Sequence, residues 1–451
     1  MSARSRCLAW LAQVEHSHGN PSSHQTPLFE PETERELSPH DSAWLSDENR
    51  PLARKRKRAT EFVDTSRGFP AQQRTAQLEG MAQLHPEDND STPTQAKRRK
   101  RRMGDDAISD SGTGATQEEA SSQRSTSPVK QINRLYSLET PVVDAMFSDE
   151  LIETLPPDMR DLFAELERCQ RLRTTVPAQF KPILREAHPM RSIWREENIW
   201  KEDNTSETPT LDEMISVARE ASELAMYNEL EASWNSQCHG PLLVLARRLC
   251  RHRDHIRVAN ITSARPHRRL IPSVPAGGKM VDFGILLRPQ DGDALSRAYT
   301  TCILPEDDGV CHFNHSSSQQ IARNPLAISI ETKRADTGGD SAKLQLRLWA
   351  ATQMKWLAEV RRISVVMAPH KVFLPLLVAI GSRWHWFFAA GEFDAQTGAL
   401  QRTVVYEQQF IGDVGKLEGA FAVLEALIAL MDWMQNSWRP WLETWLGVGR
   451  H

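Results

Sequence analysis

The sequence predicts an α/β fold in which helices flank a mixed central sheet. Apolar residues concentrate in the C-terminal half of the 451-residue chain, after about Leu211. The roughly 240 residues that follow are enough for one well-buried α/β domain. In this half, short runs rich in β-branched residues alternate with longer stretches of helical periodicity, which is the element order of a layered α/β domain.

Three segments of different composition divide the chain. Residues 1–135 are dominated by Ser, Thr, Gln and charged side chains, and too few apolar positions recur there to offset the entropy of folding. A disordered tail is therefore expected. Residues 136–188 suggest a linker of short helical segments that is broken at Pro156-Pro157, and residues 189–451 are expected to form the α/β domain.

Two basic clusters, Arg54–Arg58 and Lys97–Arg102, lie in the predicted tail. Short Lys/Arg runs on a flexible chain are read by nuclear import receptors and also bind phosphates non-specifically. A solvated charge run has the same composition. We expect the clusters to direct the protein to the nucleus, because two of them occur in one tail. The net charge of −4 favours no partner by itself.

The cysteines and the apolar runs indicate an intracellular, soluble protein. None of the six cysteines belongs to a Cys-x-x-Cys pair, and the N-terminus lacks the apolar segment of a secretory signal. The longest apolar run, Val372–Ile380, contains Pro375 and is far shorter than the roughly 20 residues that span a bilayer. No membrane partner is expected.

The first long helix of the domain is predicted over Leu211–Leu230. Apolar residues recur there at helical spacing, and Thr210 with Glu213 three positions later resembles a capping box. The helical pattern continues beyond this range to a second amphipathic stretch, Leu242–Leu249. Gly240-Pro241 is expected to interrupt the helix between the two stretches.

The remaining elements alternate between strands and helices. Three short apolar runs predict strands at Met280–Leu287, Leu326–Glu331 and Ile363–Ala368. A helix over Ser341–Leu357, opened by Gly338-Gly339-Asp340, follows the second of these strands. Further strands are expected at His385–Ala390 and Thr403–Tyr406, and a closing helix at Val414–Trp433.

Three residues carry the strongest chemical signal. The two-residue period of a strand places Glu331 and Lys333 on one face. Asp282 is the one acid in an otherwise apolar strand, where an unpaired carboxylate costs several kcal/mol. If the two strands pair, Asp282 and Glu331 can share a hard divalent cation, which prefers oxygen ligands and keeps waters for a substrate phosphate.

These residues resemble the signature of the PD-(D/E)XK nuclease superfamily, and the surrounding sequence is similar to a fungal group within it. Asp282 matches the first acid, Glu331-Thr332-Lys333 matches the following motif, and Gln345 with Trp349 matches an accessory motif on the next helix. The resemblance covers roughly the last 250 residues and implies a restriction-endonuclease-like core. It also implies an acid on a preceding helix; Glu231 is the favoured candidate, with Glu229 and Glu223 as rivals.

The resemblance implies a metal-dependent nuclease. Asp282 and Glu331 would hold one or two Mg2+ (or Mn2+) ions, with Glu231 completing the shell through water. Lys333 would orient the attacking water or neutralise the phosphate, and Gln345 would position Lys333 or the backbone. DNA is the expected substrate in preference to RNA. The alternatives are a catalytically inactive module of the same fold that binds nucleic acid or a protein, and a scaffold localised by its tail.

Other patterns leave further alternatives open. Two groups of Cys and His residues have the donor types of a zinc site, but neither contains a Cys-x-x-Cys pair, and buried thiols and surface histidines account for them better: Cys302, Cys311, His312 and His315; and Cys238, His239, Cys250, His252 and His255. Basic residues that would line a nucleic-acid groove, or form ordinary solvated charges, are Arg247, Arg248, Arg268, Arg269, Lys343 and Arg347. Tryptophans that would stack on bases, or more often belong to a core, are Trp384, Trp386, Trp433, Trp438, Trp441 and Trp445.

Overall fold

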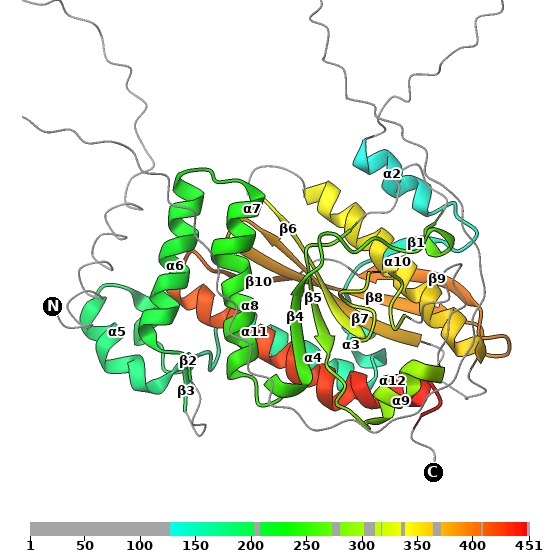
Figure 1. Ribbon diagram of the computed structural model, residues 1–451. Coiled ribbons are helices and arrows are strands. Elements are labelled where there is room, and N and C mark those ends of the chain that lie inside the picture. Colours follow the sequence, from blue (N-terminus) through cyan, green and yellow to red (C-terminus); the bar gives the residue numbers. More distant parts are fainter. Residues whose placement is uncertain are drawn as a thin grey trace, which may run out of the picture. The chain divides into compact units, whose positions relative to one another are not determined.

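A mixed sheet with strand order β1-β9-β8-β7-β6-β5-β4 forms the centre of the computed structural model (Figure 1). The structure describes residues 127–202, 208–272, 280–301, 312–316, 318–334, 339–363, 371–406 and 409–448. Both basic clusters, and the predicted tail up to residue 126, lie outside these ranges. The last residues of that predicted tail form helix α2, Pro128–Leu135.

The sheet contains parallel and antiparallel neighbours. β6 pairs in parallel with β7, and β1 pairs in parallel with β9. The β4–β5, β5–β6, β7–β8 and β8–β9 pairs are antiparallel, and β10 joins the sheet antiparallel to β8. The strands are β1 (Val142–Ala145), β4 (Ile256–Asn260), β5 (Phe283–Leu287), β6 (Leu326–Lys333), β7 (Lys371–Ile380), β8 (Arg383–Phe393), β9 (Leu400–Tyr406) and β10 (Gln409–Asp413).

Helices cover the sheet and give it the expected α/β layers. Helix α10 packs against β6, β7, β8 and β9, whereas α11 packs against β10 and against α4, α6 and α8. Figure 1 shows α10 and α11 on either side of the sheet. The helices are α3 (Asp149–Thr154), α4 (Pro157–Gln170), α5 (Lys181–Ala187), α6 (Leu211–Met226), α7 (Glu231–Ser233), α8 (Gly240–Leu249), α9 (Ala294–Thr301), α10 (Gly339–Ile363), α11 (Leu417–Trp433) and α12 (Arg439–Trp445).

The segment between residues 136 and 188 contributes directly to these layers. Its strand β1 supplies an edge of the main sheet, with Val143 in register with Val404. The helical pattern breaks at Pro156-Pro157, as the sequence predicts: α3 ends before Pro156 and α4 begins at Pro157, because proline favours the first turn of a helix and interrupts its interior. Val176–Pro177 (β2) and Trp200–Lys201 (β3) form a separate two-stranded sheet.

The first long helix begins as predicted and ends earlier than predicted. Thr210 and Glu213 form the expected capping box, with the side chain of Thr210 accepting a hydrogen bond from the Glu213 N–H and the Glu213 carboxylate from the Thr210 N–H. The helix ends at Met226. Asn228 then takes a left-handed conformation with φ 50°, which turns the chain before α7.

The predicted interruption at Gly240-Pro241 is wrong. Helical structure runs from Glu231 to Leu249, with a π-helical segment at Trp234–His239 directly before Gly240. The wide turn accommodates a proline that has no N–H to donate. Glycine suits this position because a Cβ on residue 240 would lie 2.8 Å from the Asn235 carbonyl oxygen. The break therefore falls at Asn228.

The later elements agree with the expected order. β5, β6, β8, β9, α10 and α11 occupy the positions predicted for them, with ends shifted by a few residues. The strand predicted at Ile363–Ala368 lies outside the described residues except for Ile363, which ends α10; the next described strand is β7. Among the described residues, no helix is both long and apolar enough to cross a membrane.

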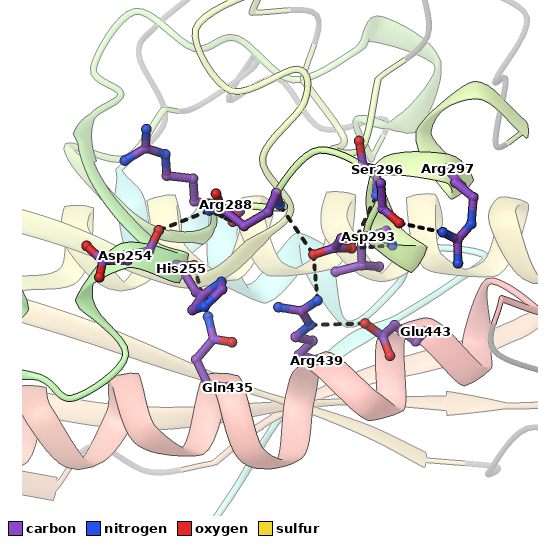
Figure 2. A network of polar contacts seen from close by, with 12 residues as sticks. Asp254, His255, Arg288, Asp293, Ser296, Arg297, Gln435, Arg439 and Glu443 are labelled. Carbon is purple, nitrogen blue, oxygen red and sulfur yellow. Dashed lines mark hydrogen bonds and ion pairs between the residues drawn. The ribbon is translucent and has the colours of Figure 1, made fainter.

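A polar network holds the C-terminal helix against the loop that follows β5 (Figure 2). The Arg439 guanidinium donates to Asp293 Oδ2 at 2.6 Å and to Glu443 Oε1 at 3.0 Å. Asp293 in turn accepts from the Leu295 N–H at the start of α9. One carboxylate thus caps α9 and anchors α12.

The tryptophans belong to the core. Trp445 donates its indole N–H to the Leu357 carbonyl, which joins α12 to α10. Trp441 is partly buried against the same core. Trp384, Trp386, Trp433 and Trp438 are buried, as is Trp445, so five of the six serve the core and only Trp441 is partly exposed.

Candidate active site

The candidate residues lie at the end of β6 and the start of β5. The register pairs Phe283 with Ile330, so Asp282 lies beside the Glu331 end of β6. Trp349 on α10 donates its indole N–H to Ser329 Oγ at 2.9 Å, which places Ser329 on the α10 face of the sheet. Glu331 is two residues further along the strand and therefore points to the same face.

The Lys333 ammonium is the centre of the polar contacts. Its Nζ lies 2.5 Å from Glu331 Oε1, donates to the Thr332 carbonyl at 2.7 Å, and lies 3.4 Å from both carboxylate oxygens of Glu231. Burial lowers the pKa of Lys333, but the surrounding carboxylates outweigh this effect and raise it. Lys333 is therefore charged at neutral pH.

Glu231 on α7 is the helical acid that reaches this centre. Its two rivals face other partners, because Glu229 accepts a hydrogen bond from the Ser233 hydroxyl and Glu223 lies 4.0 Å from Arg219. Partial burial raises the pKa of Glu231, with Lys333 opposing the shift.

Glu331 is fully buried and has few hydrogen-bond partners. Among the described residues its Oε2 has no hydrogen-bond donor, and Oε1 has only the Lys333 ammonium. Burial, and then the negative charge of Asp282, raise the pKa of Glu331 to about 8. An additional cation beside Glu331 would therefore stabilise its ionised form.

Asp282 is held by a residue that the sequence pattern did not single out. The Thr332 N–H and hydroxyl both donate to Asp282 Oδ2 at 2.8 Å. Strand alternation assigns Thr332 to the opposite face from Glu331, but Asp282 precedes β5 and its carboxylate meets the backbone at the end of β6. Only strand pairing reveals this contact.

Gln345 supports the site from α10. Its side-chain amide donates to the Met280 carbonyl at 3.0 Å, two residues before Asp282, and its carbonyl accepts from the Ser341 hydroxyl at 3.3 Å. Gln345 is expected to position either Lys333 or the backbone. Its contact is with the backbone, at the Met280 carbonyl.

The donor set is compatible with a hard divalent cation. Asp282 and Glu331 supply carboxylate oxygens, and the unsatisfied Glu331 Oε2 is the atom that most lacks a positive partner. No group of three or more His, Cys, Asp or Glu residues in the described ranges is arranged to hold a metal. Mg2+ does not require such a group, since it commonly binds through one or two carboxylates, waters and substrate phosphates.

In the second Cys/His group, Cys238, His239 and Cys250 are packed in the core. Cys238 and Cys250 are buried free thiols, and burial raises the pKa of each to about 12, so neither is a thiolate. His239 is stacked on Trp234 with ring centroids 5.6 Å apart. Of the other group, Cys302 and Cys311 lie outside the described residues.

Most of the arginines predicted to line a groove have structural partners. Arg247 donates to the Ile256 carbonyl, Arg248 pairs with Glu213, and Arg269 pairs with Glu359. These contacts join helices and strands of the domain, and they leave the guanidinium groups less available to phosphates.

The architecture and the site together define a class of protein. A mixed sheet that carries acids and a lysine at adjoining strand ends is the arrangement of restriction-endonuclease-like domains. A family model described as the PD-(D/E)XK nuclease superfamily matches residues 180–439, more than half of the chain, and the chain belongs to this superfamily. A search of curated proteins found no match.

Proposed function

We propose that this protein is a metal-dependent nuclease that hydrolyses phosphodiester bonds of nucleic acid, DNA in preference to RNA. The contact set of Lys333 is the observation that carries the proposal. One ammonium lies against two carboxylates and a backbone carbonyl, next to the Thr332-bound carboxylate of Asp282. Burying acids beside a cation costs free energy, and groups perturbed in this way cluster at functional sites.

Each residue has a role that follows from its contacts. Asp282 and Glu331 would hold Mg2+ or Mn2+, which supplies an acidified water and neutralises charge on the phosphate. Lys333 is able to leave Glu231 and turn to a phosphate oxygen, because both of those contacts are 3.4 Å long. Glu231 would then accept a hydrogen bond from the attacking water, and Gln345 keeps the Met280–Asp282 backbone in place.

Changing Lys333 to Ala tests the proposal. We expect plasmid or oligonucleotide cleavage in Mg2+ or Mn2+ to fall at least about a hundredfold, the effect of removing one preorganised charge donor. Lys355→Ala on α10 is the matched control and should cut normally. Circular dichroism checks that both variants fold. Equal activity in wild type and Lys333→Ala would exclude this catalytic role.

A second function has its own supporting observation. The Lys333 ammonium already neutralises the charges of Glu331 and Glu231 without a metal ion. The same arrangement would suit a module that keeps the fold and binds nucleic acid or a protein without cutting. Calorimetric titration with Mn2+ separates the two functions. Heat of binding that is lost in Asp282→Asn favours the nuclease, and the absence of any Mn2+ signal favours the inactive module.

The proposed nuclear location rests on the basic clusters Arg54–Arg58 and Lys97–Arg102. A fluorescent fusion of the full chain should accumulate in the nucleus, and replacement of both clusters by alanine should leave it outside. A fusion with Glu118 and Glu119 changed to alanine is the control, because it removes nearby charges of the opposite sign and should still accumulate. Nuclear accumulation without the basic clusters would refute their role.

A further inference from the structure

A row of side chains crosses the sheet from the candidate active site to β8. The registers pair Glu331 with Val378 on β7, and Val378 with His385 on β8. Directly paired residues point to the same face, so His385 lies on the α10 face that carries Glu331. Two strand spacings separate the two residues, a distance of about 10 Å.

A cavity opens at the His385 end of this row. It has a volume of about 510 Å³ and lies between α10, β1, β8, β9 and β10. Ligand sites in proteins typically measure about 300–1,000 Å³, so a single nucleotide fits this space. The polar and aromatic residues of its lining include Asp144, Lys343, Arg347, His385, Tyr406 and Phe410.

The charges of the cavity favour an anion. Arg347 and Asp144 neutralise one another through an ion pair of 2.6 Å, and the Tyr136 hydroxyl also donates to Asp144. Lys343 has no carboxylate within ion-pair distance in the described ranges, so its ammonium remains available. The cavity therefore presents one uncompensated positive charge, which suits a phosphate.

Two side chains of the cavity suit a base. His385 is 9% exposed, and its Nδ1 has no hydrogen-bond partner among the described residues. Burial, then the charges of Arg383 and Lys343, lower the pKa of His385 to about 4, so the ring is neutral at neutral pH. Phe410 is partly exposed, and its ring lies 5.3 Å from the His385 ring and 5.5 Å from the Arg383 guanidinium carbon. This aromatic surface can stack on any base.

We propose that this cavity binds one unpaired nucleotide of the substrate strand, with Lys343 at its phosphate and Phe410 and His385 at its base. The inference rests on the proposed nuclease function and adds a substrate class to it. A base within a duplex is stacked on its neighbours and must leave the stack to enter a recess. Single strands and frayed or unpaired ends are therefore bound in preference to a closed duplex.

Binding in the absence of metal tests the cavity separately from cleavage. The probe is a fluorescently labelled DNA oligonucleotide, used as a single strand and as a blunt duplex, in EDTA with the full-length protein. The variants are Lys343→Gln and Phe410→Leu, which preserve side-chain bulk, and Lys355→Gln on the same helix is the matched control. Fluorescence anisotropy gives the affinity at several salt concentrations.

We expect wild type to bind the single strand more tightly than the duplex. Phe410→Leu should weaken single-strand binding about tenfold, as for the loss of one base-stacking contact. Lys343→Gln should weaken it to a similar extent and reduce the salt slope by about 0.7, as for the loss of one phosphate contact. Lys355→Gln should bind as wild type does.

The outcomes separate the cavity from the catalytic proposal. Single-strand binding that is equal in wild type, Lys343→Gln and Phe410→Leu overturns the cavity, even if wild type cuts DNA in Mg2+. Binding that depends on Lys343 and Phe410 in a protein that never cuts supports the cavity and refutes the nuclease. Equal affinity of wild type for single strand and duplex contradicts the preference for an unpaired nucleotide.

Discussion

Glu331→Gln is expected to reduce cleavage at least about a thousandfold while making the folded protein more stable at pH 8. The loss of activity follows because an amide cannot replace the buried carboxylate as a cation ligand, and metal ions contribute several kcal/mol to such reactions. The gain in stability follows from the burial of Glu331 and from its pKa, which is raised from 4.5 to about 8.

The sign of the pH dependence is set by this raised pKa. Between about pH 4.5 and 8 the folded protein keeps a proton on Glu331 that the unfolded chain releases. The unfolded state therefore binds fewer protons, and stability falls as pH rises through this window. Glutamine is neutral at every pH and therefore does not lose stability in this window. The free energy of unfolding of the variant should exceed that of wild type by on the order of 2–4 kcal/mol at pH 8, and by little at pH 5.

Urea denaturation at pH 5, 6.5 and 8, without metal, measures the effect. Glu392→Gln on β8 is the control with the opposite sign. Hydrogen bonds from Arg402 and Lys371 outweigh burial and lower the pKa of Glu392, so its contribution is present at neutral pH and lost in acid. If Glu331→Gln destabilises the protein at pH 8, the ionised Glu331 carboxylate does not destabilise the folded state.

Acid should destabilise the protein through His239. This side chain is fully buried, stacked on Trp234 and in edge contact with Trp384, 5.4 Å between ring centroids. Burial lowers its pKa from 6.5 to about 3. Below pH 6.5 His239 becomes protonated in the unfolded chain but stays neutral in the folded protein, so stability is lost as pH falls from 6.5 towards 3.

Wild type is expected to lose about 2 kcal/mol of its free energy of unfolding at pH 5 through His239, since each pKa unit corresponds to about 1.4 kcal/mol. His239→Leu should abolish this loss. At pH 7 the change should be small, because neither ring nitrogen has a hydrogen-bond partner among the described residues. Denaturation at pH 7 and pH 5 compares it with His252→Gln, whose side chain is 26% exposed and should matter less. Identical acid sensitivity in wild type and His239→Leu would rule out His239 as the source.

Local patterns in the sequence were sufficient to predict many elements and to propose the central site residues. The capping box at Thr210 and Glu213 is a contact between neighbours, and therefore follows from spacing alone. The shared face of Glu331 and Lys333 follows from the period of one strand. Asp282 stood out because a single acid in an apolar run needs a partner.

Other features depended on contacts between distant segments. The π-helical turn before Gly240 and the turn at Asn228 are set by how the helix packs, which propensity does not encode. No local pattern indicated that Val142–Ala145 would pair with β9. Four residues do not make a recognisable periodic pattern, and their place at the sheet edge depends on burial against other elements.

The sequence predicts an α/β domain of the PD-(D/E)XK type, which the family model confirms, and it proposes Asp282, Glu331, Lys333 and Gln345 as the site residues. Contacts between distant segments were needed to show that Glu231, and neither of its rivals, lies beside Lys333, that Thr332 holds Asp282, and that a cavity lies two strands away from Glu331. The physical reason is the range of the interactions. Periodicity and capping act within a few residues, whereas strand register and helix docking bring together side chains that are far apart in the chain.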